Sequence, residues 1–219
     1  MKSFCIIGLG NFGKNLALTL AQNGNQVLVI DNVESDIDAI ADHVTNAVCG
    51  DPTNEMVLRA AGVASYGCCV VCLGRDNMQE SILVTLTLKE LGIPKIVARA
   101  SSEQHRKVLT KVGADMVVFP EKDMGRKLAY TLAKTDVFEF INFSKDHSIV
   151  ELKTPRRWAG KAIKDLDVRK RYGVNIIAIS KAGSSDDFEI FTDPDRVLAP
   201  EETLVIIGGN EEIEKITGK

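Results

Sequence analysis

Several classes of protein are disfavoured by what this sequence of 219 residues contains little of. Lys and Arg number 27 and Asp and Glu number 30, without a Lys/Arg cluster long enough to follow a phosphate backbone, so a nucleic-acid partner is disfavoured. The least polar stretch, residues 60–74, is about 15 residues long, whereas a membrane-spanning helix needs roughly 20 strongly apolar residues. The apolar run near the N-terminus is broken by Gly8 and Gly10 and is too short for a secretory signal. We therefore expect no direct membrane insertion, and any role at a membrane has to come through a partner.

Residues that carry catalysis, metal binding or disulfides are equally sparse. The three histidines, His43, His105 and His147, follow no catalytic or zinc-binding spacing and are expected on the surface. The five cysteines are an odd number and lie in or beside apolar runs, so we expect buried, reduced thiols in a cytosolic protein. Cys69 and Cys72 form a C-x-x-C spacing, but within a strand rather than at a helix N-terminus, where a reactive thiol is favoured. An enzyme is therefore disfavoured.

The chain does contain enough apolar residues to bury a core, 45% against 26% charged residues. Its first part alternates β-rich runs with segments of helical periodicity. The run 26–30 is almost entirely apolar, which is typical of a strand covered on both faces of a parallel sheet. This alternation predicts an α/β domain over residues 1–135, a doubly wound parallel sheet of the Rossmann type. The expected strands are 3–7, 26–30, 45–49, 68–73, 95–100 and 116–119, and the expected helices are 11–22, 34–42, 53–61, 77–91, 103–112 and 120–135.

From Val137 onward the pattern changes to short runs that alternate apolar and polar residues, typical of half-buried strands. A short helical segment is expected over 159–165, and polar turns are expected at 182–187 and 193–195. We expect a second, smaller β-rich (α+β) domain over 137–219, with the boundary near Asp136. Its expected strands are 137–143, 149–152, 174–180 and 204–207.

Gly8, Gly10 and Gly13 form a G-x-G-x-x-G sequence directly after the first expected strand, and Asp31 stands at the end of the second. This placement matches the dinucleotide-binding fingerprint. The glycines permit a tight turn, close approach of a pyrophosphate and close helix–strand packing, and Asp31 is placed to accept hydrogen bonds from a ribose. An acidic residue at this position disfavours NADP, but it does not distinguish NAD from AMP, ADP or ATP.

Other polar residues follow strands at the same edge of the expected sheet. Asp51 and Thr53 are candidates to contact an adenosine, Arg99 to neutralise a phosphate, and Glu121 to hold a divalent cation. Each has a structural alternative, because Asp51 or Thr53 can cap the following helix and Arg99 can be a surface charge. The candidate nucleotide site comprises Gly8, Gly10, Asn11, Phe12, Gly13, Asp31, Asn32, Asp51, Thr53, Leu73, Gly74, Arg99 and Glu121, with Glu121 as metal ligand.

Several motifs occur together in one order. They are C-I-I-G-L-G-N-F-G at 5–13, K-E-L-G-I-P at 89–94, V-L-T-K-V-G-A-D at 108–115 and P-E-K-D-M-G at 120–125. Together they resemble the regulatory subunits of Ktr/Trk-type potassium uptake systems, the RCK or KTN family. The second half resembles the family's RCK C-terminal domain, so the likeness covers essentially the whole chain.

The resemblance implies a cytosolic protein whose dimers assemble into an octameric ring, held at the inner face of the cell membrane by a membrane-embedded potassium channel or transporter subunit. Nucleotide state would set the ring's shape, with ATP favouring the active form and ADP the inactive form, and some relatives bind NAD(H). Glu121 matches the position that binds magnesium or another cation beside the phosphates. Asn11 stands where these proteins often carry an Arg that engages the terminal phosphate of ATP, so the preference among ATP, ADP, AMP and NAD(H) stays open.

A second pattern, in the C-terminal half, is similar to the family's pocket for cyclic di-AMP at a domain dimer interface. The resemblance implies that Asp167 and Asn175 form hydrogen bonds with the edges of the adenine rings and that Arg169 contacts a phosphate. It also implies that Ile163 and Ile176 pack on the apolar faces of the rings. The alternative from the residues themselves is that Asp167 and Arg169 are a solvated surface pair and that Ile176 is strand core. Lys164 stands where the family prefers an apolar residue.

We therefore expect a non-enzymatic, nucleotide-controlled regulatory subunit of a potassium uptake channel or transporter. The alternative is an NAD-dependent oxidoreductase or an NAD(H) sensor. The expected helix 77–91 offers apolar surface that packs either on a neighbouring subunit or on the helix's own sheet. The apolar residues of this helix are Met78, Ile82, Leu83, Leu86 and Leu91.

Overall fold

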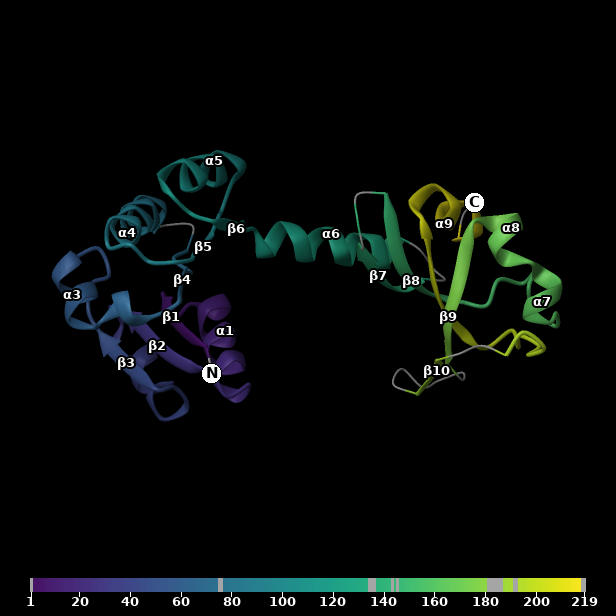
Figure 1. Ribbon diagram of the computed structural model, residues 1–219, viewed down its shortest axis with the longest axis horizontal. Coiled ribbons are helices and arrows are strands. Elements are labelled where there is room, and N and C mark those ends of the chain that lie inside the picture. Colours follow the sequence, from purple (N-terminus) through teal and green to yellow (C-terminus); the bar gives the residue numbers. More distant parts are fainter. Residues whose placement is uncertain are drawn as a thin grey trace. The chain divides into compact units, whose positions relative to one another are not determined.

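The computed structural model describes residues 2–74, 77–133, 137–142, 144, 146–180, 187–190 and 193–217. It divides into two compact units, Met1–Pro120 and Glu121–Lys219 (Figure 1). The domain limits expected from the sequence, 1–135 and 137–219, stay a prediction, and the compact units meet earlier, at Pro120. The expected boundary at Asp136 and most of the expected turn at 182–187 lie outside the described residues.

The first unit is built on a six-stranded parallel sheet with the strand order β3-β2-β1-β4-β5-β6. This order is that of the doubly wound dinucleotide-binding fold, in which ligands bind where the strand order reverses. Here the reversal lies between β1 and β4, which pair in parallel. The predicted Rossmann-type α/β fold is confirmed. The strands are β1 Ser3–Ile7, β2 Gln26–Asp31, β3 Asn46–Cys49, β4 Cys68–Val71, β5 Ile96–Arg99 and β6 Met116–Val118.

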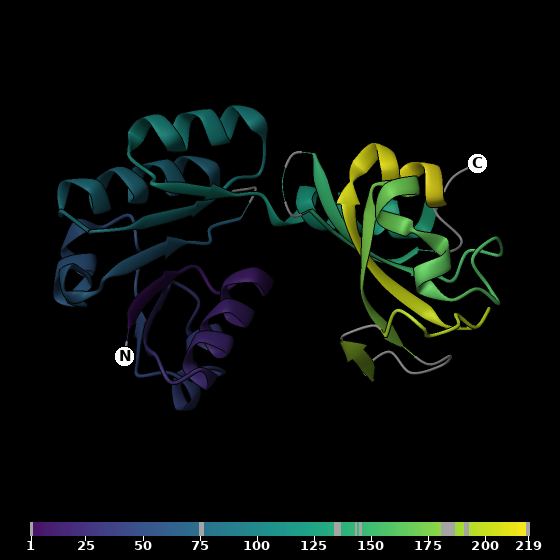
Figure 2. The same cartoon turned by 45° about the vertical axis from the view of Figure 1, so that its right-hand side comes forward.

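Helices cover both faces of this sheet, and Figure 2 shows α1 on one side and α4 and α5 on the other. Three of the expected helices are shorter than predicted, and the helix expected over 77–91 differs by only one residue at each end. The helix predicted from 34 ends at Asp38 and is followed by a 3-10 turn, Ala41–His43. The helix predicted from 53 begins at Glu55, because the side chain of Asn54 accepts a hydrogen bond from the N–H of Met56 and caps it. The helices are α1 Asn11–Gln22, α2 Glu34–Asp38, α3 Glu55–Ala60, α4 Met78–Glu90 and α5 Glu103–Val112, with a second 3-10 turn at Val63–Ser65.

The two faces of the sheet carry separate apolar cores, because successive side chains of a strand point to opposite faces. In β1, Cys5 and Ile7 join the core that includes Val84 and Leu88 of α4. Ile6 joins the opposite core, which includes residues of α1 and α2.

Four of the five cysteines are buried, as predicted, and all five are free thiols. A side-chain hydrogen bond with Cys69, together with burial, raises the pKa of Cys5 well above its usual value. The prediction was wrong for Cys49, which is exposed at the end of edge strand β3. Edge strands of an open sheet are covered on fewer sides than central ones, and an apolar run alone does not reveal that position.

The second unit contains an antiparallel sheet of five strands in the order β10-β9-β11-β8-β7. The predicted small β-rich domain is therefore present. The short helices after β8 and the C-terminal helix were only partly foreseen, since the sequence predicted one helical segment there. The elements are α6 Pro120–Ala133, β7 Val137–Asn142, β8 His147–Lys153, α7 Ile163–Leu166, α8 Val168–Tyr172, β9 Val174–Ser180, β10 Phe188–Ile190, β11 Thr203–Gly209 and α9 Asn210–Thr217.

The core of the second unit forms between one face of this sheet and the helices α7, α8 and α9. Trp158, the single tryptophan of the chain, is fully buried there. Its ring lies 5.1 Å from that of Tyr172 at the end of α8, a separation typical of stabilising aromatic pairs. Among the described residues, no helix has the length and apolar character needed to cross a membrane.

Candidate functional site

The carboxyl ends of β1, β2, β3 and β4 meet at one edge of the first sheet, where the fold binds its ligands. A small cavity of about 40 Å³ opens among these ends. It brings together five residues predicted for the nucleotide site, and three more that were not among the predicted site residues. The predicted residues are Asp31, Asn32, Asp51, Thr53 and Leu73, and the added ones are Pro52, Asn77 and Glu80. Asn77 and Glu80 come from the start of α4, whose position over this edge follows only from the fold.

The glycine loop after β1 has the geometry that the fingerprint requires. Gly8 has a φ of +96°, which favours glycine, and its N–H donates to the carbonyl of Ile30 at 2.9 Å. A Cβ on Gly13 would lie 1.9 Å from the carbonyl oxygen of Gly8. A Cβ on Gly10 would meet nothing within 4 Å. The loop and α1 therefore pack tightly at Gly13, while the space beside Gly10 is open.

Asp31 is 9% exposed and its carboxylate is already hydrogen-bonded within the protein. One oxygen accepts the N–H of Leu9 at 2.6 Å, and the other accepts the N–H of Val33 at 2.9 Å. The first bond ties the glycine loop to the end of β2, across 22 positions of sequence. Each carboxylate oxygen can accept more than one hydrogen bond, so both retain capacity for a ribose hydroxyl. The sequence analysis did not predict that Asp31 forms these hydrogen bonds within the protein.

Asp51 and Thr53 form a local turn rather than a helix cap. One carboxylate oxygen of Asp51 accepts both the hydroxyl of Thr53 at 2.7 Å and its N–H at 2.9 Å. These hydrogen bonds lower the pKa of Asp51, the side-chain bond contributing most. The capping alternative is wrong, since Asn54 caps α3.

The remaining loop residues differ in burial. Asn11 is the exposed first residue of α1, and its carbonyl accepts the side-chain amide of Asn15. Phe12 packs against the core shared with α1 and α2, which gives it a structural role. Leu73 contacts the glycine loop, because a Cβ on Gly8 would lie 3.0 Å from its Cδ2 atom. A Cβ on Gly74 would meet nothing within 4 Å, so the backbone there is open to a ligand.

Arg99 lies half-buried at the end of β5. Burial raises the pKa of Cys72 to about 12, and the charge of Arg99 opposes that rise. Cys72 lies beside the loop, since a Cβ on Gly13 would approach its Cβ to 3.1 Å. Arg99 is half-buried rather than fully exposed, and its role at a phosphate stays a prediction.

Glu121 lies in the first turn of α6, which belongs to the second compact unit. In the part of the chain that the structure describes, no group of three or more His, Cys, Asp or Glu side chains is arranged to hold a metal ion.

The residues predicted to bind cyclic di-AMP occupy one region of the second unit. Ile163 and Ile176 both pack at the margin of its core. Asp167 has a φ of 44°, between α7 and α8, and its carboxylate lies 3.8 Å from the ammonium of Lys170. Asp167 therefore pairs with Lys170 rather than with Arg169, which corrects one alternative from the sequence. Arg169 and Asn175 are exposed, and Lys164 pairs with Asp195.

The histidine prediction was wrong for His105, which is 1% exposed on α5. Its Nδ1 accepts the N–H of Ser101 at 3.3 Å and lies 3.2 Å from the Ser101 hydroxyl. Burial lowers the pKa of His105. His43 and His147 are exposed as predicted. The period of α5 places His105 four residues before the buried Leu109, a signal that could have identified its buried position.

Comparison with known proteins finds the same two-part organisation. Residues 4–120 match the TrkA-N domain and residues 147–218 match the TrkA-C domain. The chain is 37% identical over 216 residues to the Ktr system potassium uptake protein C of Bacillus subtilis (strain 168), covering 98% of this chain and 95% of that protein. It is 39% identical over 214 residues to the Ktr system potassium uptake protein A of the same organism, again covering 98% and 95%.

Solved structures of a channel resemble the chain over most of its length. A structure described as the GsuK channel superimposes with a TM-score of 0.71 at 23% identity, covering all of this chain and 40% of that one, which shows the fold alone. A structure of the GsuK channel bound to NAD has a TM-score of 0.56 and 28% identity, covering 99% of this chain and 38% of that one. A third, GsuK bound to ADP, has a TM-score of 0.52 and 31% identity over 60% of this chain and 34% of that one. The chain therefore spans less than half of these channel chains.

Proposed function

The chain belongs to the family of proteins with a TrkA-N and a TrkA-C domain, and on this premise we propose that it is a regulatory, non-enzymatic subunit of a Ktr-type potassium uptake system. The two relatives from Bacillus subtilis are potassium uptake proteins that align over nearly their whole length. The site proposed for control is the edge of the first sheet. The observation that carries the proposal is the convergence there of the glycine loop, Asp31, Asp51 and Thr53.

The proposed ligand of this edge is an adenine nucleotide, ATP or ADP. Its phosphates would lie against Gly10 and the N-terminus of α1, where the backbone is open and the helix dipole favours negative charge. Asp31 would accept a ribose hydroxyl, Asp51 and Thr53 would contact the adenosine, and Arg99 would stabilise the phosphate charge. The cavity of about 40 Å³ is far smaller than an ordinary small-molecule site, so the ligand would lie across the open edge.

Two finer features stay predictions. Glu121 is the predicted ligand of magnesium or another cation, on the family resemblance alone. Asn11 supplies no charge at the loop, so we do not assign a preference for ATP over ADP, AMP or NAD(H).

NAD(H) is the second candidate ligand, with an NAD(H) sensor or an NAD-dependent oxidoreductase as the corresponding function. The relevant observation is that one similar channel structure contains NAD. An acidic residue after the second strand is compatible with the ribose of NAD as well as with that of ATP. An oxidoreductase additionally requires hydride transfer to a substrate, which the sensor does not.

The test is calorimetric titration of the full chain with ATP, ADP, AMP, NAD and NADH, each with and without magnesium. Asp31→Asn and Asp51→Asn are expected to weaken binding about tenfold or more, since each removes charge-assisted hydrogen bonds. Asp38→Asn, an exposed change at the end of α2, is the matched control. Binding of NADH alone, with oxidation of NADH by a small carbonyl compound, would favour the oxidoreductase. The absence of any nucleotide binding would overturn the proposed site.

Cyclic di-AMP is the proposed ligand of the second unit, at Ile163, Asp167, Arg169, Asn175 and Ile176. Their common region, with two apolar and three polar side chains, supports this. Arg169→Ala should abolish stabilisation by cyclic di-AMP in a thermal-shift titration and leave the nucleotide response intact. Arg171→Ala, an exposed change on the same helix, is the matched control, and an unchanged response in Arg169→Ala would contradict the assignment.

The proposed partners are a membrane-embedded potassium channel or transporter subunit and further copies of this chain, in dimers that form an octameric ring. The proposed location is the cytoplasm, at the inner face of the cell membrane, without insertion and without a nucleic-acid partner. A ligand shifts such a ring between two shapes only by the difference in its affinity for them. Coupled sites in one ring add their contributions, so a modest preference per site is sufficient.

A further inference from the structure

The second unit contains a larger cavity that no part of the proposed function uses. It measures about 620 Å³, within the range of small-molecule sites. Its walls come from the end of β8 and the loop that follows, from the loop before β11, and from the end of α9. None of the five residues assigned to cyclic di-AMP lines it.

Among the charged residues that line this cavity, basic side chains outnumber acidic ones. Lys153, Arg156 and Arg157 contribute three positive charges, and Glu201 contributes one negative charge. Lys153 and Arg156 are exposed and take part in none of the ion pairs formed among the described residues. Two cations beside a cavity and without carboxylate partners favour an anionic ligand, since charge-assisted hydrogen bonds are the strongest polar contacts available to them.

The third cation is held in place. The guanidinium of Arg157 donates to the carbonyl of Lys215 in α9 at 3.1 Å and stacks over the ring of Tyr172, 5.1 Å from its centroid. Such contacts keep a guanidinium oriented before any ligand arrives, which reduces the entropy lost on binding.

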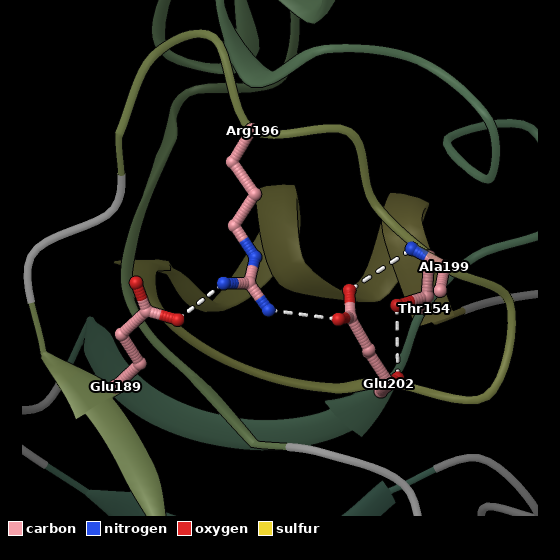
Figure 3. Close-up of polar contacts among 5 residues, drawn as sticks. All are labelled: Thr154, Glu189, Arg196, Ala199 and Glu202. Carbon is pink, nitrogen blue, oxygen red and sulfur yellow. Dashed lines mark hydrogen bonds and ion pairs between the residues drawn. The ribbon is translucent and has the colours of Figure 1, made fainter.

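The loop before β11, which contributes Pro200 and Glu201 to the lining, is braced by Glu202. Figure 3 shows the contacts of Glu202. Thr154 donates both its N–H and its hydroxyl to the carbonyl of Glu202, each at 2.8 Å. The carboxylate of Glu202 accepts the N–H of Ala199 at 2.9 Å and the guanidinium of Arg196 at 2.8 Å. Arg196 also pairs with Glu189 of β10. These contacts fix the chain on both sides of Pro200 and Glu201, so the cavity has a defined wall.

We propose that this cavity is a binding site for a small organic phosphate, a ligand with at least two negative charges and a compact apolar part. The charges would meet Lys153, Arg156 and Arg157. The apolar part would meet the remaining lining, which is largely nonpolar. The apolar lining residues are Leu152, Pro155, Pro200 and Ile216.

The experiment is calorimetric titration of the full chain with phenyl phosphate and, separately, with inorganic phosphate. Phenyl phosphate is expected to bind more tightly, because only it fills the apolar part of the cavity. Lys153→Glu and Arg156→Glu are expected to weaken its binding about tenfold or more. Among the described residues, neither side chain takes part in an ion pair, so neither change removes a stabilising charge contact.

Lys161→Glu is the matched control, because Lys161 is exposed in the same unit but does not line the cavity. Asp51→Asn separates this site from the nucleotide site and should leave phenyl phosphate binding unchanged. Three outcomes would overturn the proposal: no binding at millimolar concentration, an equal loss in Lys161→Glu, or sedimentation with phosphatidylglycerol vesicles without any response to the soluble phosphates.

Discussion

Asp31 shows, at the scale of a single residue, how a predicted ligand group also holds the fold. Its carboxylate fixes the N–H of Leu9 in the glycine loop and the N–H of Val33 after β2. Hydrogen bonds to a charged group contribute about 1.5–3 kcal/mol each. A loss of nucleotide binding in an Asp31 variant therefore needs a separate measurement of stability before it is assigned to the ligand.

Two substitutions in the glycine loop separate the effect on nucleotide binding from the effect on stability. Gly13→Ala would place a Cβ 1.9 Å from a backbone oxygen that cannot move freely, and should lower the free energy of unfolding by about 1–3 kcal/mol or more. Gly10→Ala meets open space at a φ of −56°, so its stability should stay within about 0.5 kcal/mol while nucleotide binding weakens. Urea denaturation and calorimetry on both variants test this. Equal stability of the two would contradict the packing at Gly13.

The buried His105 predicts a pH dependence of stability. Burial lowers its pKa in the folded protein, whereas a histidine in the unfolded chain has a pKa of about 6.5. The unfolded state therefore binds more protons below that pH, and the stabilisation present above it is lost as the pH falls.

When the pH is lowered from about 7.5 to about 5.5, the free energy of unfolding of His105→Asn should fall less than that of the unsubstituted protein. The difference between the two proteins can be at most about 1.4 kcal/mol per pH unit, the contribution of one titrating group. His43→Asn, at an exposed position, is the control. Urea denaturation at both pH values measures this, and equal pH dependence in His105→Asn and the unsubstituted protein would refute it.

At the scale of elements, helix starts and ends were predicted less well than the elements themselves. The segment 34–42 has enough helical pattern for one helix, yet it forms a short α2 and a separate 3-10 turn. The start of α3 depends on which of three polar residues in a row, Thr53, Asn54 or Glu55, serves as cap. Local propensities of these residues are similar, and the turn made by Asp51 and Thr53 decides among them.

The brace at Glu202 predicts a local loss of stability. Glu202→Ala removes the acceptor for Arg196 and for the N–H of Ala199, and should lower the free energy of unfolding of the second unit by about 1.5–3 kcal/mol. Glu201→Ala, an exposed neighbour, should change it by less than about 0.5 kcal/mol. Hydrogen exchange across β8 and β11 reports the local effect. Identical protection in the two variants would show that the brace contributes nothing.

At the scale of the whole molecule, helix α4 has one face buried in its own chain and another face exposed, where a neighbouring subunit of the proposed ring would pack. Val84 and Leu88 face the chain's own core. Leu83 and Leu86 remain 48% and 40% exposed. The alternative that this helix covers its own sheet is therefore confirmed for one of its faces. Packing of the exposed face on a neighbouring subunit stays a prediction.

Leu83→Asp should reduce the mass of the assembly measured by light scattering, because it places a charge on the exposed face of α4. Met56→Asp is the matched control, since Met56 is 74% exposed on α3. Far-UV circular dichroism checks that both variants fold. An unchanged mass in Leu83→Asp would remove this face from the proposed ring.

Three features could be predicted from the sequence, because each depends on residues close together in the chain. They are the alternation of strands and helices, the glycine fingerprint with Asp31, and the change to a β-rich second half. Three others became visible only in the folded chain: the hydrogen bond between Asp31 and Leu9, the burial of His105, and the contacts of Glu202 beside the basic cavity. These contacts join residues from different elements. Their formation depends on how the strands and helices pack, which local propensity does not encode.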